Sequence, residues 1–287
     1  MYVSLAVASL VCHRDVPLAT RCLSSLLTYS REPLRLSLHD DGSLTDTDIE
    51  TMTAALPGAR VIRRREADDL MADTLRRHPT CATFRGRNPF ALKLLDAPLT
   101  TDGPVLRYCD TDVLFFRPFQ QLFELPDDVD AVFMTDTHDA YTLRSWQLLA
   151  HRLRLVSRSN AGLMCFRMSR FDLDRVEWFL KQVTPSHLRH FAEQTAWALL
   201  AGPLVTRQWD SAQVRFIVRG VPRPAGLVAG HYIGPFRDLL GEVSDDDLAP
   251  TSTPPVTLVT QPATTIGALA LATREAQRVL RRIVGLR

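Results

Sequence analysis

Apolar residues in the first part of the chain recur with two alternating periods, one typical of buried strands and one typical of helices. The segment 2–12 is rich in Val, Leu and Ala, as a strand buried on both faces is. Shorter strands are predicted at 34–38, 59–63 and 105–109, and segments with helical spacing separate the strands, at 16–29, 45–56, 66–77 and 89–96. Strands that alternate with helices predict an α/β fold with a mainly parallel central sheet and helices on both faces.

The pattern is less regular after residue 112. Strands are predicted at 131–135 and 161–168, helices at 171–183 and 190–201, and short β segments within 205–220 and 227–233. The segment 251–263 is rich in Pro and Thr and predicts an extended linker, whereas 264–287 has the spacing of a helix. We therefore expect one domain, residues 1–250, followed by the linker 251–263 and a C-terminal helix, 264–287.

Composition excludes several classes of protein. The chain has 287 residues, enough to bury a substantial core without disulfides. Hydrophobic residues make up 46% and charged residues 23%, a balance that excludes wholesale disorder and collagen-like repeats. The net charge of +2 argues against a nucleic-acid partner. A transmembrane helix needs about 18 consecutive apolar residues, and no apolar stretch of the sequence is that long.

The cysteines and the first predicted strand indicate the cellular compartment of the protein. The five cysteines are an odd number without metal-binding spacing, which indicates a reducing compartment. The first apolar run lacks the basic residues that precede the apolar part of a signal peptide. We therefore expect the protein in the cytoplasm.

Positive charge is concentrated at the end of the chain. Residues 274–287 hold five arginines and one glutamate, a net charge of +4, so the rest of the chain carries −2 of the total of +2. Apolar residues recur at helical spacing among these arginines. Two interpretations stay open for 264–287: a peripheral helix on the inner face of an anionic membrane, where a lipid-linked acceptor would be found, or a helix docked on the domain or in a dimer.

Two carboxylates follow the strand predicted at 105–109, in the string Asp110-Thr111-Asp112. At a spacing of i, i+2 they share one face of an extended chain. Open α/β sheets bind ligands at the carboxyl ends of their strands, and carboxylate oxygens there can hold a hard divalent cation. The apolar flanks would bury these charges, which then need a partner. The alternative is an acidic turn between two strands.

A similar polar string, Asp40-Asp41-Gly42-Ser43, follows the strand predicted at 34–38. Glycine permits a tight turn, and carboxylate and hydroxyl groups can bind a ribose or a base. The alternative is an ordinary Asx-type turn without a ligand.

These two strings, in this order, resemble sites of the GT-A (Rossmann-like) glycosyltransferases. The string 110–112 looks like their DxD metal motif, and 38–43 looks like their nucleotide-binding turn. Three further strings are similar to those of the family 8 enzymes, glycogenin-like and bacterial galactosyltransferase-like: SNAGLM at 159–164, EQTA at 193–196 and HYIG at 231–234. The five matches follow the family's order and cover about residues 1 to 240.

The resemblance implies a transfer of sugar from a nucleoside-diphosphate sugar, with UDP as the nucleotide, to a hydroxyl acceptor, with retention at the sugar carbon. The acceptor would be a glycan, a lipid-linked molecule or a small molecule. The cofactor would be Mn²⁺ or Mg²⁺, held by Asp110, Asp112 and His231, and this mixed O/N set suits Mn²⁺ better than Ca²⁺. The implied catalytic residues are Asn160, Glu193 and Gln194. The implied nucleotide and sugar contacts are Cys12, His13, Asp40, Asp41, Arg87, Lys93, Asp110, Thr111, Gly234 and Arg237.

Two positions depart from the family pattern. Arg237 stands near the place where the family usually has a lysine for the diphosphate, and Glu193 stands where aspartate is common. Arg85, Arg87 and Lys93 precede the DxD string and would either clamp phosphates or be solvated surface. Lys93 is favoured for a phosphate because it is one of only two lysines.

Three other functions compete with this interpretation. The string 110–112 also resembles the opening motif of haloacid-dehalogenase-like phosphatases, with Asp110 as nucleophile, Asp112 as general acid, and Lys181 and 245–247 for the later motifs. That motif normally lies in the first strand of its domain, whereas three strand–helix units precede it here. A nucleotidyltransferase usually carries a glycine-rich basic loop after its first strand, which the string CHRD at 12–15 is not. The third alternative is a non-catalytic binder of nucleotide sugars.

Overall fold

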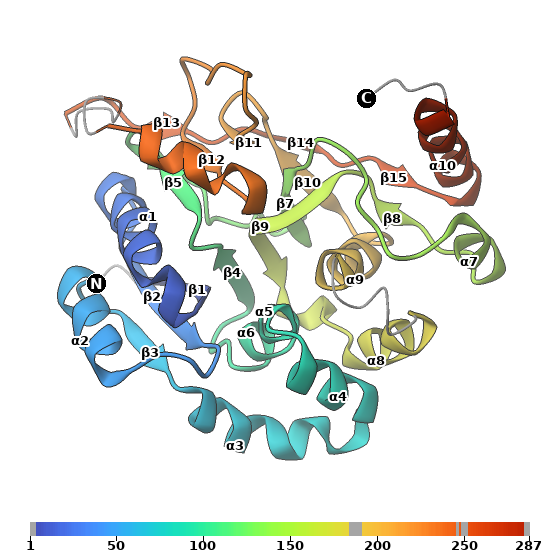
Figure 1. Ribbon diagram of the computed structural model, residues 1–287, viewed down its shortest axis with the longest axis horizontal. Helices are drawn as coiled ribbons and strands as arrows, with labels where there is room; N and C mark the ends of the chain where they lie inside the picture. Colours follow the sequence, from blue (N-terminus) through green and yellow to red (C-terminus); the bar gives the residue numbers. More distant parts are fainter. Residues whose placement is uncertain (1–3, 184–190, 245–246, 248–251, 284–287) are drawn as a thin grey trace.

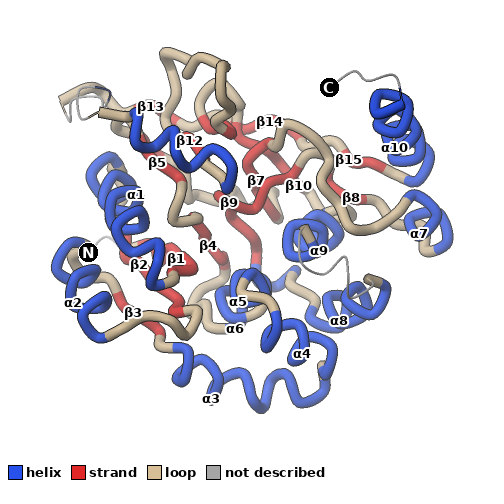
Figure 2. Tube along the Cα trace, in the orientation of Figure 1, coloured by secondary structure: helices blue, strands red, loops and turns tan. Residues whose placement is uncertain are grey.

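The computed structural model describes residues 4–183, 191–244, 247 and 252–283. An eight-stranded sheet crosses the middle of the molecule, in the order β14-β10-β7-β9-β4-β1-β2-β3 (Figure 1, Figure 2). Its strands are β1 (Leu5–Val11), β2 (Leu34–Asp40), β3 (Arg60–Ile62), β4 (Val105–Cys109), β7 (Ala131–Thr135), β9 (Ser159–Arg167), β10 (Thr206–Trp209) and β14 (Thr260–Pro262).

Most neighbours in this sheet are parallel. The pairs β1–β2, β2–β3, β1–β4 and β7–β10 run parallel, whereas β9 is antiparallel to both β4 and β7. The reversed direction of β9 matters for the site, because its first residues lie where β4 and β7 end. The predicted α/β fold with a mainly parallel sheet is confirmed.

Successive residues of the central strands enter two different cores, so both faces of the sheet are buried. Val7, Val105 and Val132 pack in one core, and their next neighbours in the other. The first core includes side chains of α1 (Val16–Tyr29) and α2 (Asp46–Ala55). The second includes side chains of α3 (Arg64–Thr74), α4 (Pro79–Arg87), α5 (Phe90–Leu94), α6 (Asp96–Leu99), α8 (Leu173–Gln182) and α9 (Ala192–Ala201).

A three-stranded sheet stands beside the large one and carries the late part of the chain to the carboxyl end of β4. Its order is β11 (Val214–Phe216), β12 (Ala229–His231) and β5 (Val113–Phe115). Strands β12 and β5 are antiparallel, and their register sets His231 opposite Val113. His231 therefore lies next to the loop that joins β4 to β5, and the 3₁₀ helix η4 (Gly234–Glu242) follows it.

The segment predicted as a linker is extended, but part of it belongs to the domain. Strand β14 pairs with β10 at one edge of the large sheet, and β13 (Val256–Thr257) pairs with β6 (Phe119–Gln120). After it, β15 (Thr265–Ile266) pairs with β8 (Leu155–Val156). The β-branched residues of this segment favour strands, and an edge strand tolerates the proline at its end.

The last helix, α10 (Ala268–Ile283), packs against α7 (Ser145–Ala150) at one side of the molecule (Figure 1). Arg274 forms an ion pair with buried Asp139, and Ser145 Oγ donates to Glu275 Oε2 over 2.7 Å. Leu271 is buried by this contact, whereas Leu269 and Leu280 are exposed. The described part of the tail therefore docks on the domain. Among the described residues, no helix is long and apolar enough to cross a membrane.

Candidate metal centre and its surroundings

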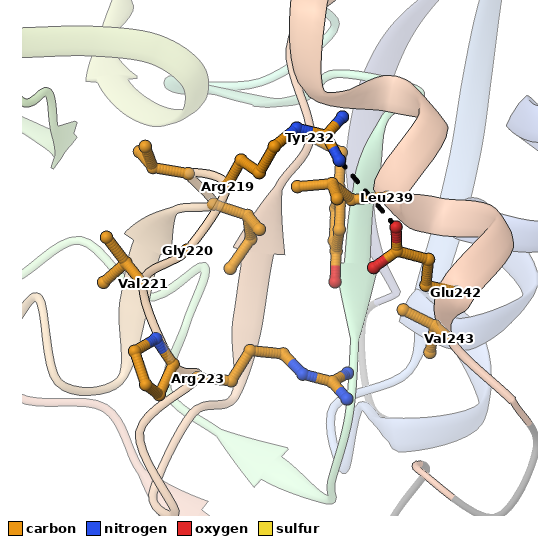
Figure 3. Close-up of a pocket in the computed structure, with 11 residues that line it drawn as sticks. Arg219, Gly220, Val221, Arg223, Tyr232, Leu239, Glu242 and Val243 are labelled. Carbon is orange, nitrogen blue, oxygen red and sulfur yellow. Dashed lines mark ion pairs between the residues drawn. The ribbon is translucent and has the colours of Figure 1, made fainter.

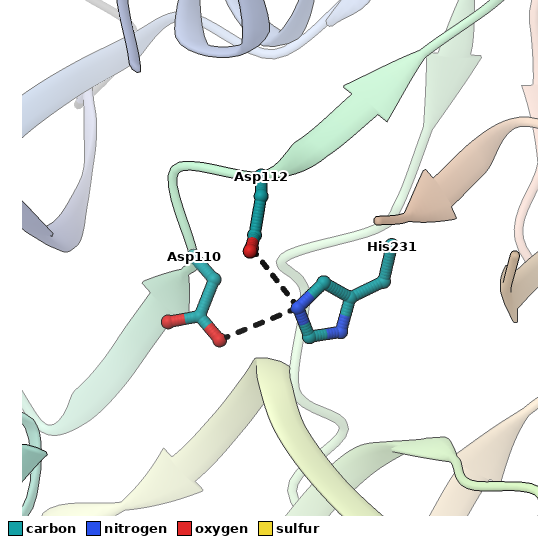
Figure 4. A group of neighbouring side chains, drawn as sticks. All are labelled: Asp110, Asp112 and His231. Carbon is teal, nitrogen blue, oxygen red and sulfur yellow. Dashed lines mark hydrogen bonds and ion pairs between the residues drawn. The ribbon is translucent and has the colours of Figure 1, made fainter. Parts of the chain in front are cut away.

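Three side chains that could hold a metal ion meet at the carboxyl end of β4 (Figure 4). Asp110 follows β4, Asp112 precedes β5 and His231 ends β12. His231 Nε2 lies 3.0 Å from Asp112 Oδ1 and 3.6 Å from Asp110 Oδ2. One ligand atom from each residue lies within 4.8 Å of the others. The predicted metal ligands are thus brought together by pairing between strands that are far apart in the sequence.

The chemistry and the packing of this group fit a divalent cation. Two carboxylates and one imidazole form a donor set that suits Mn²⁺, and also Mg²⁺ through the oxygens. Asp112 and His231 are buried, so the ligand atoms are held by the surrounding structure. Gly162 leaves the room that the imidazole occupies, because a Cβ there would lie 2.2 Å from His231 Cε1.

Two cationic side chains pair with these carboxylates, one with each. Lys93 Nζ lies 2.9 Å from Asp110 Oδ2, and Arg237 Nε donates to Asp112 Oδ2 over 2.9 Å. Burial lowers the pKa of Lys93, but the charges of Asp110 and Glu193 outweigh burial and raise it, so the ammonium keeps its proton. Burial raises the pKa of Asp112, but His231 and Arg237 outweigh it and lower the value. Both groups are therefore charged in the protein as described.

Glu193 and Gln194 lie in the first turn of α9, and each has a buried polar atom without a partner. Glu193 Oε1 lies 3.7 Å from Lys93 Nζ, beyond hydrogen-bond distance. Both Glu193 Oε1 and Gln194 Nε2 are buried without a hydrogen-bond partner among the described residues. Buried polar groups normally have partners, so these atoms are available for the polar groups of a ligand. Burial raises the pKa of Glu193 to about 7, with Lys93 opposing the shift and Asp110 adding to it.

Replacing Glu193 is expected to change how stability depends on pH in the metal-free protein. Native Glu193 keeps its proton up to a pH of about 7, whereas an unfolded glutamic acid loses it near 4.5. Between these values the unfolded state binds fewer protons, so this residue lowers the free energy of unfolding by up to about 1.4 kcal/mol per pH unit as pH rises.

Urea unfolding at pH 5 and pH 7.5 measures this effect. We expect Glu193→Gln to be more stable than the wild type at pH 7.5, with a smaller difference at pH 5. Equal pH dependence of the two proteins would show that Glu193 ionises in the native state as it does in the unfolded chain.

Asn160 lies beside the metal ligands, with its amide already engaged by the protein. Its Nδ2 donates to Asp136 Oδ2 over 3.1 Å, and its Oδ1 accepts from the backbone N–H of Gly162 over 2.9 Å. Sequence reasoning missed Asp136 and the steric role of Gly162. Asp136 follows the strand β7 as Asp110 follows β4, so the same strand-end rule would have found it.

The predicted nucleotide-binding turn lies at the carboxyl ends of β1 and β2 and is held by its own contacts. Asp40 Oδ1 accepts from the backbone N–H groups of Gly42 and Leu44. The side chain of Asp41 accepts from Ser43. Gly42 has a φ of +102°, which a glycine adopts without strain. This geometry contains the Asx-type turn, in which Asp40 is buried and Gly42 and Ser43 are exposed.

The segment after β1 connects this turn to the metal ligands. The backbone N–H of His13 donates to Ser43 Oγ over 2.8 Å, and its ring lies 2.7 Å from Asp48. Cys12 is half-buried, and burial raises the pKa of its thiol. Asp15, which sequence reasoning did not single out, accepts from Arg237 over 2.7 Å. Arg237 therefore joins the end of β1 to Asp112.

The remaining predicted contacts are distributed around the site. Thr111 is buried and lies in the chain between Asp110 and Asp112, and Gly234 is exposed at the start of η4. Arg87 is exposed in the last turn of α4. Arg85 is buried and donates to both oxygens of Asp96, so it is engaged within the protein. Of the three basic residues before the DxD string, Lys93 is the one in contact with a metal-ligand candidate.

A separate hollow of about 280 Å³ lies beside η4, with Tyr232 in its wall (Figure 3). Two arginines of its wall are paired: Arg219 Nη1 lies 3.9 Å from Glu242 Oε1, and Arg223 pairs with Asp247, which lies outside the lining. None of the site residues predicted from the sequence lines this hollow.

Comparisons with solved structures identify the fold. The galactosyltransferase LgtC, in complex with donor and acceptor sugar analogues, superposes with a TM-score of 0.55 at 14% identity, over 84% of this chain and 98% of that one. Mouse xyloside xylosyltransferase 1 gives a TM-score of 0.51 at 14% identity, over 80% and 97%. GlyE from Streptococcus pneumoniae TIGR4, also a glycosyltransferase, gives 0.52 at 11% identity, over 84% and 60%.

These similarities confirm the predicted GT-A fold over most of the chain. At such low sequence identity they establish the fold and leave the activity to the site. No protein-family model matches the sequence, and no curated protein matches it.

Proposed function

We propose that this protein is a metal-dependent glycosyltransferase that moves a sugar from a nucleoside-diphosphate sugar to a hydroxyl acceptor. The observation that carries the proposal is the meeting of Asp110, Asp112 and His231 at the carboxyl end of β4, within a GT-A fold. Lys93 and Arg237 pair with the two carboxylates, Glu193 lies 3.7 Å from Lys93, and Gln194 is the next residue in the chain. Glu193 and Gln194 each have a buried polar atom without a partner. Cationic groups can neutralise the charge of a diphosphate, and uncharged or acidic polar groups can form hydrogen bonds with the hydroxyls of a sugar.

Each residue has a role that follows from its contacts. A bound Mn²⁺ or Mg²⁺, held by Asp110, Asp112 and His231, would stabilise the negative charge that grows on the leaving diphosphate. Arg237 adds positive charge beside Asp112, and Lys93 adds it beside Asp110. Glu193 and Gln194 would orient the donor sugar through its hydroxyl groups, since their free polar atoms can accept and donate hydrogen bonds.

UDP as the nucleotide and retention at the sugar carbon are the finer parts of the proposal. Both rest on the resemblance of the strings at 159–164, 193–196 and 231–234 to family 8 enzymes. In a retaining transfer the leaving phosphate can take the proton of the acceptor hydroxyl, so no protein base is required. The turn of Asp40 and Asp41, at the end of β2, is the proposed contact for the nucleoside.

The phosphatase alternative fits the contacts less well. Lys181 would have to neutralise the nucleophile Asp110, but its ammonium pairs with Glu177 within α8. The lysine at Asp110 is Lys93, from a different element. In addition, Asp110 follows β4, with three strands of the sheet before it in the sequence. Of the acidic string 245–247 proposed for this alternative, 245 and 246 lie outside the described residues.

Product analysis separates these functions directly. We expect the protein with Mn²⁺ to release UDP from a UDP-sugar, by transfer or by slow hydrolysis, and to release no phosphate from p-nitrophenyl phosphate. Phosphate release without a nucleotide sugar would favour the phosphatase. Tight binding of the nucleotide sugar without any turnover, hydrolysis included, would favour the non-catalytic binder.

We further propose a peripheral contact of α10 with the inner face of an anionic membrane, where a lipid-linked acceptor would be within reach. Two observations support it: Leu269 and Leu280 are exposed on α10, and residues 274–287 carry a net charge of +4. The full chain should sediment with phosphatidylglycerol vesicles, and Leu269→Ser with Leu280→Ser should weaken this. Equal sedimentation of both proteins, or none by the wild type, would contradict the contact.

A further inference from the structure

Three buried side chains connect the end of β7 to His231. Asp136 follows β7, Asn160 lies in β9 and His231 ends β12. Asn160 Nδ2 donates to Asp136 Oδ2 over 3.1 Å, and Asn160 Oδ1 lies 3.2 Å from His231 Nδ1. The exposed fractions of Asp136, Asn160 and His231 are 7%, 5% and 3%. Water therefore competes little for these contacts, and each polar atom depends on its protein partner.

A register shift in the sheet makes this connection. The pairing of β7 with β9 slips between Phe133 and Met134, so that Met134 lies opposite Asn160. Such irregularities bend a strand and redirect the side chains that follow it. Here the shift brings Asp136 to the start of β9, where its carboxylate can reach the amide of Asn160.

The orientation of the Asn160 amide is determined at both of its ends. The backbone N–H of Gly162 can only donate, and it lies 2.9 Å from Oδ1. The carboxylate of Asp136 can only accept, so it selects Nδ2. A flipped amide would place two donors together at Gly162 and two acceptors together at Asp136. Both mismatches would be buried, where an unsatisfied polar group is strongly unfavourable.

An amide held in this way requires a proton on Nδ1 of His231. Because Oδ1 only accepts, His231 Nδ1 must donate to it. A neutral imidazole that donates from Nδ1 has its lone pair on Nε2, the atom that lies 3.0 Å from Asp112 Oδ1 and 3.6 Å from Asp110 Oδ2. These oxygens only accept, so without a cation Nε2 faces Asp112 as a donor, and a cation bound between them takes the place of that proton. A histidine ligand requires this lone pair at the metal.

We infer that Asp136 is a positioning residue, which acts through Asn160 to present the Nε2 lone pair of His231 to a divalent cation. The inference rests on the proposed function, because it needs a cation at Asp110, Asp112 and His231. Asn160 Oδ1 is therefore already engaged by His231 Nδ1 and by the backbone N–H of Gly162 before any sugar binds.

The test exchanges the two polar side chains of the pair. Asp136 Oδ1 accepts from the backbone N–H of Thr137 over 2.6 Å. In Asp136→Asn the amide oxygen is kept on that side, so its Nδ2 turns toward Nδ2 of Asn160 and no longer selects the Asn160 orientation. The double variant Asp136→Asn with Asn160→Asp restores an acceptor toward His231 and Gly162, a donor from position 136, and the original net charge. The matched control is Asp130→Asn, because Asp130 precedes β7 at its other end and is also a buried carboxylate that accepts a backbone N–H.

Mn²⁺ affinity of each protein, measured by titration calorimetry and by electron paramagnetic resonance of free Mn²⁺, is the readout. Removing the partner of a metal-binding histidine typically weakens metal binding by about 10- to 100-fold. We expect such a loss in Asp136→Asn, recovery to within about threefold of wild type in the double variant, and no loss in Asp130→Asn.

Two results would overturn the inference: wild-type affinity in Asp136→Asn, or no recovery in the double variant when both variants melt cooperatively. Either leaves the proposed metal site standing, because the wild type still binds Mn²⁺. A wild-type protein that binds no Mn²⁺, in the presence or absence of UDP, would instead contradict the proposed function and the inference together.

Discussion

Asp112→Asn is expected to reduce metal-dependent turnover by about a thousandfold, which corresponds to about 4 kcal/mol of lost transition-state stabilisation. Asp112 contributes one of two carboxylates to the candidate metal centre, and it is also the partner of His231 and Arg237. The neutral amide keeps the shape of the side chain but has one weaker oxygen ligand. UDP release from the UDP-sugar substrate, over a range of Mn²⁺ concentrations, measures the loss.

The fold should survive this change. Arg237 keeps its contact with Asp15, and the amide oxygen introduced at position 112 can still accept a hydrogen bond. Circular dichroism and the melting temperature, both measured in the absence of metal, show whether the variant is folded. Asp110→Asn should give a similar loss, with the added effect that Lys93 loses a charged partner. Full activity in either variant, with an unchanged metal requirement, would remove these carboxylates from the mechanism.

Gly162→Ala is expected to disrupt the metal centre with a single methyl group. The new Cβ would lie 2.2 Å from His231 Cε1, 2.5 Å from His231 Nδ1 and 2.9 Å from Asn160 Oδ1. The imidazole must move, and its buried surroundings resist this. We expect Mn²⁺ affinity to fall by at least about tenfold, and the free energy of unfolding by about 1–3 kcal/mol, the usual range for overpacking.

A second glycine provides the control. A Cβ at Gly86, inside α4, would meet nothing within 4 Å. Gly86→Ala should therefore leave Mn²⁺ affinity unchanged and raise stability by about 0.5–1 kcal/mol, the gain of alanine over glycine in a helix. If Gly162→Ala binds Mn²⁺ as the wild type does, His231 can move without loss, and its observed position does not determine metal binding.

Local patterns were sufficient to predict many elements of the first half of the chain, although they missed α4, β5 and β6. The apolar spacing predicts a helix at 16–29 and a strand at 105–109, and α1 and β4 have these bounds. The buried side chains of these elements lie on regular faces. The spacing of apolar residues in the sequence therefore matches the period of a helix or a strand. The string 110–112 could also be placed, because the carboxyl end of a strand in an α/β sheet is a known position for a ligand.

Contacts between distant segments could not be predicted in this way. The contact of Lys93 with Asp110 and the opposition of Asp136 and Asn160 depend on strand order and on a register shift that leave no local pattern. The resemblance to family 8 implied a role for His231, but its pairing with Asp112 follows only from the register of β12 and β5.

The end of the chain shows how tertiary contacts override local composition. The segment 251–263 has the prolines of a linker, yet β14 extends the large sheet by pairing with β10. In the tail, Leu269 and Leu280 are exposed, whereas Leu271 packs against the domain, and apolar spacing along the helix does not distinguish them. The ion pair of Arg274 with Asp139 selects that face, and it joins residues far apart in the sequence.

The most direct test of the central claim is a thermal-shift panel of nucleotide sugars, each with and without Mn²⁺, on the wild type and on Asp112→Asn. A ligand that binds the native state raises the melting temperature to an extent that grows with its affinity and concentration. We predict that a UDP-sugar raises the melting temperature of the wild type far more with Mn²⁺ than without, and that Asp112→Asn loses this difference. A wild-type shift that does not depend on Mn²⁺, or no shift with any nucleotide sugar, would contradict a metal-dependent sugar-nucleotide site at Asp110, Asp112 and His231.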